Sequence, residues 1–472
     1  MTTTYQMNFN QDFTSLSVLS PAGLRLYSIA SQDKVEEIFA KDNTEQIRIV
    51  ERLFNSSLVV LVTAQKPNCL KMLHFKKKQD ICNCFYPSEI LCVRMNRQRL
   101  IVCLAESIHI HDIRDMKILH SIENIAPNEQ GLCALSLNSH LAFPVCQTSG
   151  ELRIFNASKL RTGMTIRAHD TPLSALAFSP SGSLLATASE RGTVIRVFCV
   201  KNGQRVQEFR RGVSCVRIAS LVFSASGDFL CASSNTETVH VFKIDGRAVE
   251  AAELKAIADV AAKSDSSAKE SVAATAAEEA PPVASWGGMF SKAVSSLLLP
   301  TQVSEVLAQD RSFATVQLAQ GGLKHICALT RVQKELRLLI ACEDGFLYVH
   351  EFLSDRGGAC KLLSVHDLRG ALTEDIIELQ LSESVLRSQV KSTSPTVTTQ
   401  PSLAMLKSCA ASVLIENPDP MQDNSYAGIL KGDQADAMSD SAKFRKLCDA
   451  IDTPTKLYDE RQFPPVAIAA KD

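Results

Sequence analysis

Two copies of one short pattern, 45 residues apart, constrain the fold of this chain more than any other feature. The run Ser174-Ala-Leu-Ala-Phe178-Ser-Pro-Ser-Gly182 recurs as Ala219-Ser-Leu-Val-Phe223-Ser-Ala-Ser-Gly227. Each copy predicts a strand, a Ser-Gly hairpin turn, a second strand that ends at Ser189 or Ser234, and a third that ends at Phe198 or Phe242. Repeats of about 40–45 residues with several strands each are typical of a β-propeller.

Weaker copies of the same unit extend the pattern along the chain. They begin near Glu89, with Arg97-Gln98-Arg99 as the turn, and near Gly131, and two more cover residues 47–86 and 324–368. The first unit covers residues 13–38, with a hairpin at Pro21-Ala22-Gly23. Together these units predict an all-β, seven-bladed, WD40-like propeller over residues 1–368.

Two segments depart from the strand pattern. Residues 246–312 interrupt the sixth blade between its third and fourth strands, and their first part is rich in alanine, glutamate, lysine and serine. That composition predicts disorder, with transient helix in the first half. Residues 369–472 accumulate serine, threonine, aspartate and proline, which predicts a mostly disordered tail with short helices near residues 372–386 and 439–451.

Composition excludes several classes of protein. A chain of 472 residues with 45% hydrophobic residues has ample material for a core, and a net charge of −1 is not that of a typical nucleic-acid binder. The fifteen cysteines lie in apolar runs behind a polar N-terminus, which predicts reduced thiols. No apolar run is long enough to cross a bilayer. We find no cofactor or metal motif and no nucleophile elbow, so an enzyme is not expected.

An arginine pair gives this fold a candidate chemistry. Arg210 and Arg211 follow a strand-like run that ends at Phe209. Successive side chains of an extended strand point to opposite faces, so the two guanidinium groups are predicted to serve two separate pockets. Arginine is also well shaped for bidentate phosphate binding. The alternative for an isolated pair is a solvated basic turn.

With these repeats, the chain resembles the PROPPIN family of WD-repeat phosphoinositide-binding propellers, and within it the branch of WIPI one and two. The resemblance covers about residues 10–368. The motifs that carry it are Asn96-Arg-Gln-Arg-Leu-Ile-Val-Cys103, Ala168-His-Asp170, Leu185-Ala-Thr-Ala-Ser-Glu-Arg-Gly-Thr-Val-Ile-Arg196, Phe209-Arg-Arg-Gly212 and Ala232-Ser-Ser-Asn-Thr-Glu-Thr-Val-His240. No Trp-Asp dipeptide ends a blade, as is usual in this family.

The resemblance implies two pockets that bind the headgroups of phosphatidylinositol 3-phosphate and the 3,5-bisphosphate. The first would use His169, Thr187, Ser189, Gly192, Thr193, Arg196 and Arg210, and the second Arg211, Ser234, Thr236, Thr238 and His240. The repeats support this division, because Ser189 and Ser234 are equivalent and so are Arg196 and His240, while Thr193 and Thr238 do not align strictly. The alternative for each hydroxyl is a bond to its own blade, and for His169 a turn-orienting role.

A membrane anchor is predicted in the insertion. Within residues 286–300, apolar side chains recur three to four residues apart and form one helical face, namely Trp286, Met289, Phe290, Val294, Leu297 and Leu298. Such a face suits an interfacial helix, and the family uses this loop for that purpose. The alternative is a loop packed on the blade.

The resemblance implies a peripheral protein of the forming autophagosome membrane, without nucleic-acid partners. It would recruit autophagy proteins of the Atg-two and Atg-sixteen type. Some of the basic residues Arg94, Arg97, Arg99 and Arg114 could form a docking surface for an acidic helix, and the alternative is a solvated face. One alternative is a 3,5-bisphosphate effector that remodels endosomal or lysosomal membranes. Another is a propeller scaffold that joins proteins without binding lipid.

Overall fold

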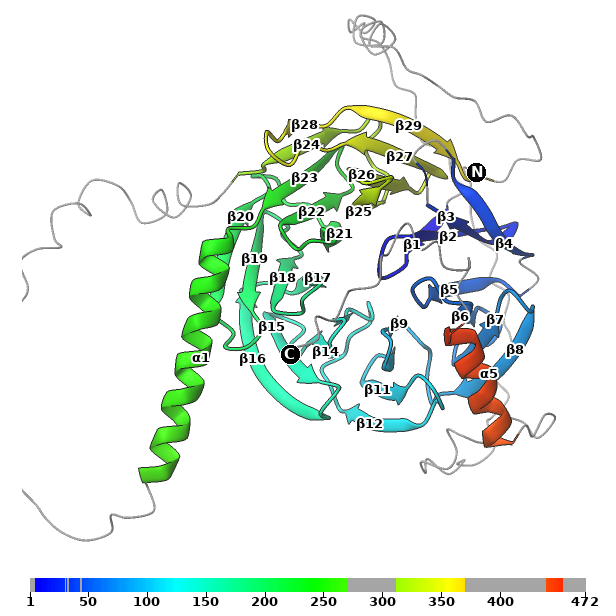
Figure 1. The fold of residues 1–472 in the computed structure, drawn as a ribbon, viewed down its shortest axis with the longest axis horizontal. Coiled ribbons are helices and arrows are strands. Elements are labelled where there is room, and N and C mark those ends of the chain that lie inside the picture. Colours follow the sequence, from blue (N-terminus) through cyan, green and yellow to red (C-terminus); the bar gives the residue numbers. More distant parts are fainter. Residues whose placement is uncertain are drawn as a thin grey trace, which may run out of the picture.

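The computed structural model describes residues 5–29, 31, 34–42, 45–269, 311–369 and 439–452. Seven antiparallel sheets, which we number as blades in chain order, are arranged in a ring (Figure 1). The predicted seven-bladed propeller is confirmed.

The first three blades contain four strands each. Blade 1 is β1 (Gln6–Phe9), β2 (Ser15–Ser20), β3 (Gly23–Ser28) and β4 (Glu36–Asp42). Blade 2 is β5 (Ile47–Arg52), β6 (Leu58–Thr63), β7 (Cys69–His74) and β8 (Gln79–Phe85), and blade 3 is β9 (Cys92–Met95), β10 (Arg99–Cys103), β11 (Ser107–Asp112) and β12 (Ile118–Glu123).

Blades 4 to 7 repeat this arrangement. They are β13 (Ala134–Leu135), β14 (His140–Pro144), β15 (Gly150–Asn156) and β16 (Arg161–His169); β17 (Leu173–Phe178), β18 (Leu184–Ser189), β19 (Val194–Cys199) and β20 (Arg205–Arg210); β21 (Ile218–Phe223), β22 (Phe229–Ser234), β23 (Thr238–Lys243), β24 (Ala314–Gln317) and β28 (Gly358–Ala359); and β25 (His325–Val332), β26 (Glu335–Cys342), β27 (Phe346–Glu351) and β29 (Leu362–Asp367). Blade 6 is the only described blade with a fifth strand, β28, which pairs parallel to β24.

The repeated Ser-x-Ser-Gly motif makes the first hairpin turn of blades 5 and 6. The Ser179 hydroxyl accepts the Leu184 amide at 3.1 Å, and the Ser224 hydroxyl accepts the Phe229 amide at 3.2 Å. The glycine that closes each turn, such as Gly182 with φ of 69°, lies in the left-handed region, which favours glycine. The motif is therefore repeated because each blade needs the same turn.

The ring closes without a strand shared between its first and last blades. At this junction the Tyr5 amide donates to the Glu343 carbonyl at 3.0 Å, and the Tyr27 hydroxyl donates to the Leu368 carbonyl at 3.3 Å. Buried side chains of blades 1 and 7 form one cluster, which includes Leu16 and Leu339. Apolar packing and a few hydrogen bonds thus take the place of a sheet ladder at this junction.

The innermost strands of all seven blades surround a central cavity of about 730 Å³. Arg94 lines it and forms an ion pair at 2.8 Å with Glu51, whose side chain is almost fully buried. Burial raises the pKa of the Glu51 carboxyl, and the Arg94 guanidinium opposes that rise. Arg94 also donates to the Cys133 carbonyl, so it links blades 2, 3 and 4.

The insertion lies where the sequence predicts it, because β23 and β24 are neighbours in blade 6 and the chain between them leaves the sheet. Its first part differs from the disordered segment that we expected. Gly246–Lys269 form helix α1, whose Ala252 and Ala256 are buried against Cys199 on blade 5. Alanine is the best helix former and leaves room for close packing, so a segment with little to bury still docks. Residues 270–310 lie outside the described part.

A second helix, α5 (Asp440–Asp452), packs against β6 and β8 of blade 2 (Figure 1). It coincides with the helix expected near residues 439–451, whereas residues 370–438 and 453–472 lie outside the described part of the chain. Among the described helices, none is both long and apolar enough to span a bilayer.

Candidate functional site

The arginine pair ends the outer strand of blade 5. Arg210 is the last residue of β20 and pairs with Val194 across the sheet, whereas Arg211 lies just beyond the strand, where its amide donates to the Thr193 carbonyl at 2.9 Å. The Arg211 Nε donates to the Gly192 carbonyl at 2.7 Å, and an Nη donates to the Ser214 carbonyl. Only 9% of Arg211 is exposed, and burial lowers its pKa. Its guanidinium is thus held by backbone oxygens.

Gly192 allows the chain after Arg211 to approach its backbone closely. Its φ is 57°, and a side-chain carbon added there would lie 1.8 Å from the Val216 carbonyl oxygen. The loop after Arg211 therefore packs on the backbone of Gly192, which no other residue permits without a shift. The sequence places Gly192 in the first pocket, while the structure shows its carbonyl holding Arg211, the cation assigned to the second.

The first predicted set lies on blade 5 and the end of β16, where most of its polar atoms have partners within the protein. His169 Nε2 lies 2.9 Å from the Thr187 hydroxyl, and Thr187 donates at 3.3 Å to the Arg196 carbonyl. Ser189 is buried, and its carbonyl accepts the Gly192 amide at 2.9 Å. This agrees in part with the alternative in which the hydroxyl groups satisfy their own blade.

Glu208, which our sequence analysis missed, neutralises Arg196. Its carboxylate accepts hydrogen bonds from Arg196 Nε at 2.6 Å and from Arg205 at 2.8 Å. Arg196 on β19 and Glu208 on β20 are cross-strand partners. Arg196 also donates to the Ala168 carbonyl at 2.7 Å. A bulge opposite Val197 and Phe198 interrupts the alternation along β20, so Arg205 also reaches this carboxylate. The pairing of β20 with β19 would have identified Glu208.

The second predicted set lies on blade 6. The Ser234 hydroxyl lies 2.9 Å from that of Thr236, and Thr238 donates at 3.2 Å to Gln317. His240 stacks on Phe242, and its buried Nδ1 has no hydrogen-bond partner among the described residues. A buried polar atom without a partner is costly in a folded protein and points to a ligand or water at that position.

The charge of Arg211 acts on His240. Burial, and after it the charge of Arg211, lowers the pKa of His240 to about 4. Burial and then the charge of Arg196 do the same to His169, whose pKa is also about 4. Each histidine is thus neutral at pH 7 and lies near an arginine. His169 ends β16 of blade 4 near Arg196 of blade 5, and His240 lies on blade 6 near Arg211, which follows blade 5.

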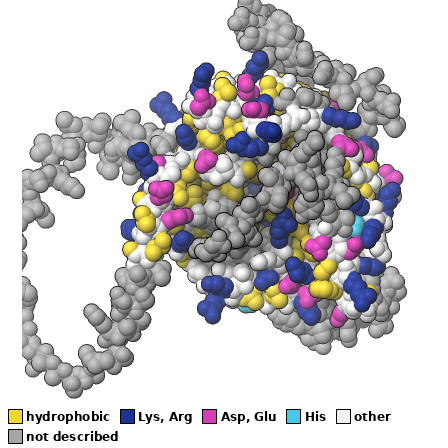
Figure 2. All heavy atoms as spheres, viewed as in Figure 1, with side chains coloured by type: hydrophobic (Ala, Val, Ile, Leu, Met, Phe, Trp, Pro, Cys, Tyr) yellow, Lys and Arg dark blue, Asp and Glu magenta, His cyan; other side chains and the backbone are white. Residues whose placement is uncertain are grey.

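The strand register supports the equivalence of the two sets. Ser189 and Ser234 each end the second strand of a blade, and Arg196 and His240 are each the third residue of the next strand. Thr238 begins β23, whereas Thr193 precedes β19, so these two threonines are not equivalent. On the face seen in Figure 2, the described lysine and arginine side chains are spread around the ring among acidic ones. The part of this face that the structure describes is therefore not uniformly basic.

Comparisons with known proteins identify the family to which this chain belongs. The family model described as PROPPIN matches residues 4–257 and 266–369. The chain belongs to the PROPPIN family. Among its relatives, mouse WD repeat domain phosphoinositide-interacting protein 2 is 46% identical over 396 residues and 82% of each chain. Caenorhabditis elegans autophagy-related protein 18 is 33% identical over 380 residues, which cover 77% of this chain and 85% of that one.

Solved structures match the fold. Kluyveromyces lactis Hsv2 has a TM-score of 0.56 at 18% identity and covers 78% of this chain and 99% of its own. A complex of KlAtg21 with the coiled-coil of AgAtg16 has a TM-score of 0.58 at 25% identity, with the same coverage. The family model and the 46% identical phosphoinositide-interacting protein 2 confirm the recognition of a PROPPIN of the WIPI one and two branch.

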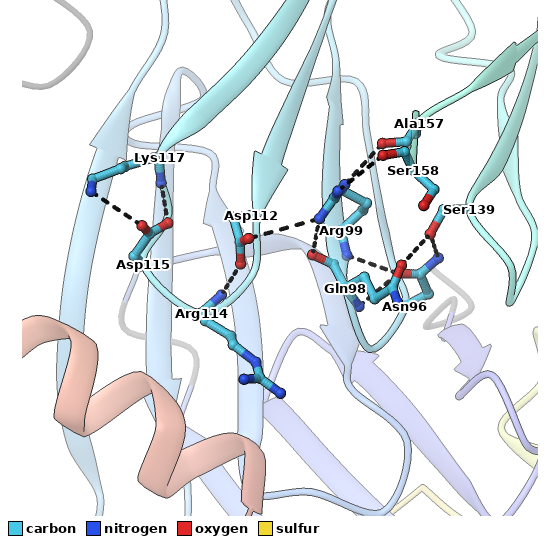
Figure 3. Close-up of polar contacts among 10 residues, drawn as sticks. All are labelled: Asn96, Gln98, Arg99, Asp112, Arg114, Asp115, Lys117, Ser139, Ala157 and Ser158. Carbon is cyan, nitrogen blue, oxygen red and sulfur yellow. Dashed lines mark hydrogen bonds and ion pairs between the residues drawn. The ribbon is translucent and has the colours of Figure 1, made fainter. Parts of the chain in front are cut away.

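The four arginines expected to form a docking surface in this PROPPIN have different roles. Arg94 faces the central cavity, and Arg99 Nε donates at 2.9 Å to the Ala157 carbonyl of blade 4. Figure 3 shows Arg99 directed toward Ala157 and Ser158, and Arg114 extending to the other side of Asp112, toward a helix. Arg97 lies over the Phe54 ring at 4.5 Å. Arg94 and Arg99 thus make contacts within the ring, and a docking role for Arg97 and Arg114 stays a prediction.

The predicted membrane segment, with Trp286, Met289, Phe290, Val294, Leu297 and Leu298, lies outside the described residues. Its role stays a prediction. Among the residues that the structure describes, no group of three or more histidine, cysteine, aspartate or glutamate side chains could hold a metal ion.

Proposed function

We propose that this PROPPIN is a phosphoinositide effector that binds phosphatidylinositol 3-phosphate and the 3,5-bisphosphate at two sites on the rim of blades 5 and 6. The observation that carries the proposal is the second site. There a guanidinium held by carbonyls lies near a buried histidine nitrogen that has no partner among the described residues. A phosphate oxygen would accept hydrogen bonds from both groups. Charge-assisted bonds of this kind are stronger than neutral ones.

Two sites on one rigid ring would raise membrane avidity. Once the first headgroup is bound, capture of the second becomes an intramolecular event with a high effective concentration. The apolar face within residues 286–300 would add a third contact, since a peripheral protein needs more than one signal for stable attachment. This chain would act by binding and not by catalysis.

The relatives support a place for this binding in autophagy, because they include autophagy-related protein 18 and the phosphoinositide-interacting proteins. We propose that the chain is a peripheral protein on the forming autophagosome and recruits partners of the Atg-two and Atg-sixteen type. The related complex with an Atg16 coiled-coil supports the second of these. Residues Arg97 and Arg114 would contact an acidic partner helix. A role on endosomes or lysosomes would follow if the 3,5-bisphosphate proved the stronger ligand.

The test is co-sedimentation with liposomes that contain phosphatidylinositol, its 3-phosphate or its 3,5-bisphosphate. The double variant Arg210→Thr with Arg211→Thr should bind at least tenfold more weakly to both phosphorylated lipids. Arg161→Thr removes an exposed arginine from the outer strand of blade 4 and should bind like the wild type. Binding by the double variant at wild-type strength would refute lipid recognition and favour the protein scaffold.

A further inference from the structure

Helix α5 packs on a surface of the propeller, and the propeller itself is complete without the helix. All seven blades are complete between Gln6 and Asp367, whereas α5 begins at Asp440, beyond residues 370–438. Leu447 and Ala450 are fully buried in an apolar cluster that spans blades 2 and 3, with Val60 and Ile81 from the one and Met116 from the other. The helix therefore lies over the groove between these two blades.

The last turn of α5 makes the polar contacts. The Ser57 amide donates at 3.0 Å to the Ala450 carbonyl, which has no partner within the helix, since the last four carbonyls of a helix are left over. Asp449 forms an ion pair with Lys77 and lies 3.2 Å from His74 Nε2. The pKa of Asp449 is lowered, chiefly by the hydrogen bond from Lys77. The negative end of the helix dipole is thus met by donors and cations of the ring.

The same end of the helix lies beside an arginine that we propose for partner docking. Arg114 belongs to the charges that shift the pKa of Cys448, which places its guanidinium near the last turn of α5 (Figure 3). Arg114 has no side-chain hydrogen bond or ion pair with any residue that the structure describes. A partner helix that approached Arg114 along this groove would meet α5.

The contact between α5 and the propeller is small enough to be reversible. Among the described side chains of α5 only Leu447 and Ala450 are fully buried, whereas Phe444 is 44% exposed. An isolated helix of 13 residues is only marginally stable in water, so α5 depends on its contact with the propeller for its own stability. Exposed ion pairs such as that of Asp449 with Lys77 contribute little.

We infer that α5 is a ligand of its own propeller, which closes the groove between blades 2 and 3 until it is displaced. The displacing partner would be an amphipathic helix with small and leucine side chains three residues apart and an acidic last turn, because that is the chemistry of the present occupant. The inference deepens the proposed partner docking, but its test does not depend on lipid binding.

The test compares two variants of the full chain. Leu447→Asp removes the buried contact, and Phe444→Asp places the same charge on the exposed face of the same helix. Hydrogen exchange should become at least tenfold faster over residues 440–452 and at the Ser57 amide in Leu447→Asp only. A fluorescein-labelled peptide of residues 439–452 should bind Leu447→Asp at least tenfold more tightly than the wild type or Phe444→Asp, because the groove has been vacated.

A charge exchange provides a second arm. Lys77→Glu should speed exchange over residues 440–452, and the addition of Asp449→Lys should restore most of the protection, while Lys78→Glu should have no effect. Equal peptide affinity for the wild type and Leu447→Asp would overturn the inference. So would a loss of protection in all seven blades of Leu447→Asp, which would make α5 part of the fold. A wild-type dimer that Leu447→Asp converts to a monomer would assign the helix to a second copy.

Discussion

The two candidate anion sites are repeats of one another, yet their charges are arranged differently. In the first, Arg196 is paired with Glu208 and His169 is bonded to Thr187. In the second, Arg211 is bound to carbonyls, and His240 Nδ1 has no partner among the described residues. The blade repeat thus conserves the positions of the side chains while changing the partners that surround them.

This difference indicates which site is ready for an anion. A carboxylate beside Arg196 would repel a phosphate and must be screened or displaced, whereas no such group pairs with Arg211. The first site therefore depends on Arg210 for its net positive charge. We expect the second site to bind a free headgroup more tightly than the first, and three experiments can break or sharpen that expectation.

The largest effect is expected at Gly192, whose carbonyl holds the cation of the second site. Gly192→Ala puts a methyl group against the Val216 carbonyl at a positive φ and should lower the free energy of unfolding by about 3 kcal/mol. Headgroup binding should fall with it, because the anchor of Arg211 moves. Gly212→Ala is the matched control, since nothing lies within 4 Å of a side chain there, and urea unfolding of both variants measures the difference.

A smaller effect separates the two histidines. Both have a pKa of about 4 in the folded protein against an ordinary value of about 6.5, so the unfolded chain takes up protons first. Stability is therefore complete above about pH 6.5 and is lost as the pH falls toward 4, by about 1 kcal/mol for each histidine at pH 5 after allowance for solvent screening.

The two histidine variants should then behave differently. His240→Gln should reduce the loss of stability between pH 7 and pH 5 at little cost at pH 7, because its Nδ1 has no described partner to lose. His169→Gln should reduce it as well but lower the stability at pH 7 by about 1 kcal/mol, since the buried Thr187 loses its partner. Denaturant unfolding at both pH values gives these numbers, and equal costs at pH 7 would show that the sites do not differ in this respect.

The smallest effect is expected at Glu208. Glu208→Gln removes the carboxylate that pairs with Arg196, so affinity for a soluble inositol 1,3-bisphosphate headgroup should rise about threefold. Glu335→Gln, at an exposed position on blade 7, serves as the control and should leave affinity unchanged. Isothermal titration calorimetry resolves such a change. Weaker binding by Glu208→Gln would mean that the carboxylate orients Arg196 for the anion.

Much of the fold followed from local sequence. The Ser-x-Ser-Gly turns fixed the strand order of blades 5 and 6 because each serine caps its own hairpin, which depends on neighbouring residues alone. The position of the insertion followed in the same way, since the strand period stops at β23 and resumes at β24. For the candidate sites, the division of Arg210 and Arg211 between two pockets stays a prediction, and the charge of Arg211 is one that acts on His240.

What the sequence did not predict depends on contacts between distant residues. Glu208 becomes a partner of Arg196 only through the pairing of β19 with β20. Arg94 points to the central cavity because β9 is an innermost strand, which no local pattern reveals. The alanines of α1 have little to bury, and their docking depends on the contact with Cys199 of a distant strand. None of these contacts could be predicted from composition alone.

The closure of the ring between Tyr5 and Leu368 has a consequence for how the chain could be cut. Because no strand crosses from the first sheet to the last, the two ends of the ring meet as complete units, within hydrogen-bonding reach of one another. A short peptide that joined residue 5 to residue 369 would allow new termini at any other junction between sheets. Such circular permutants should keep the same architecture. The junction whose opening lowers the free energy of unfolding most would be the one that contributes most to the stability of the ring.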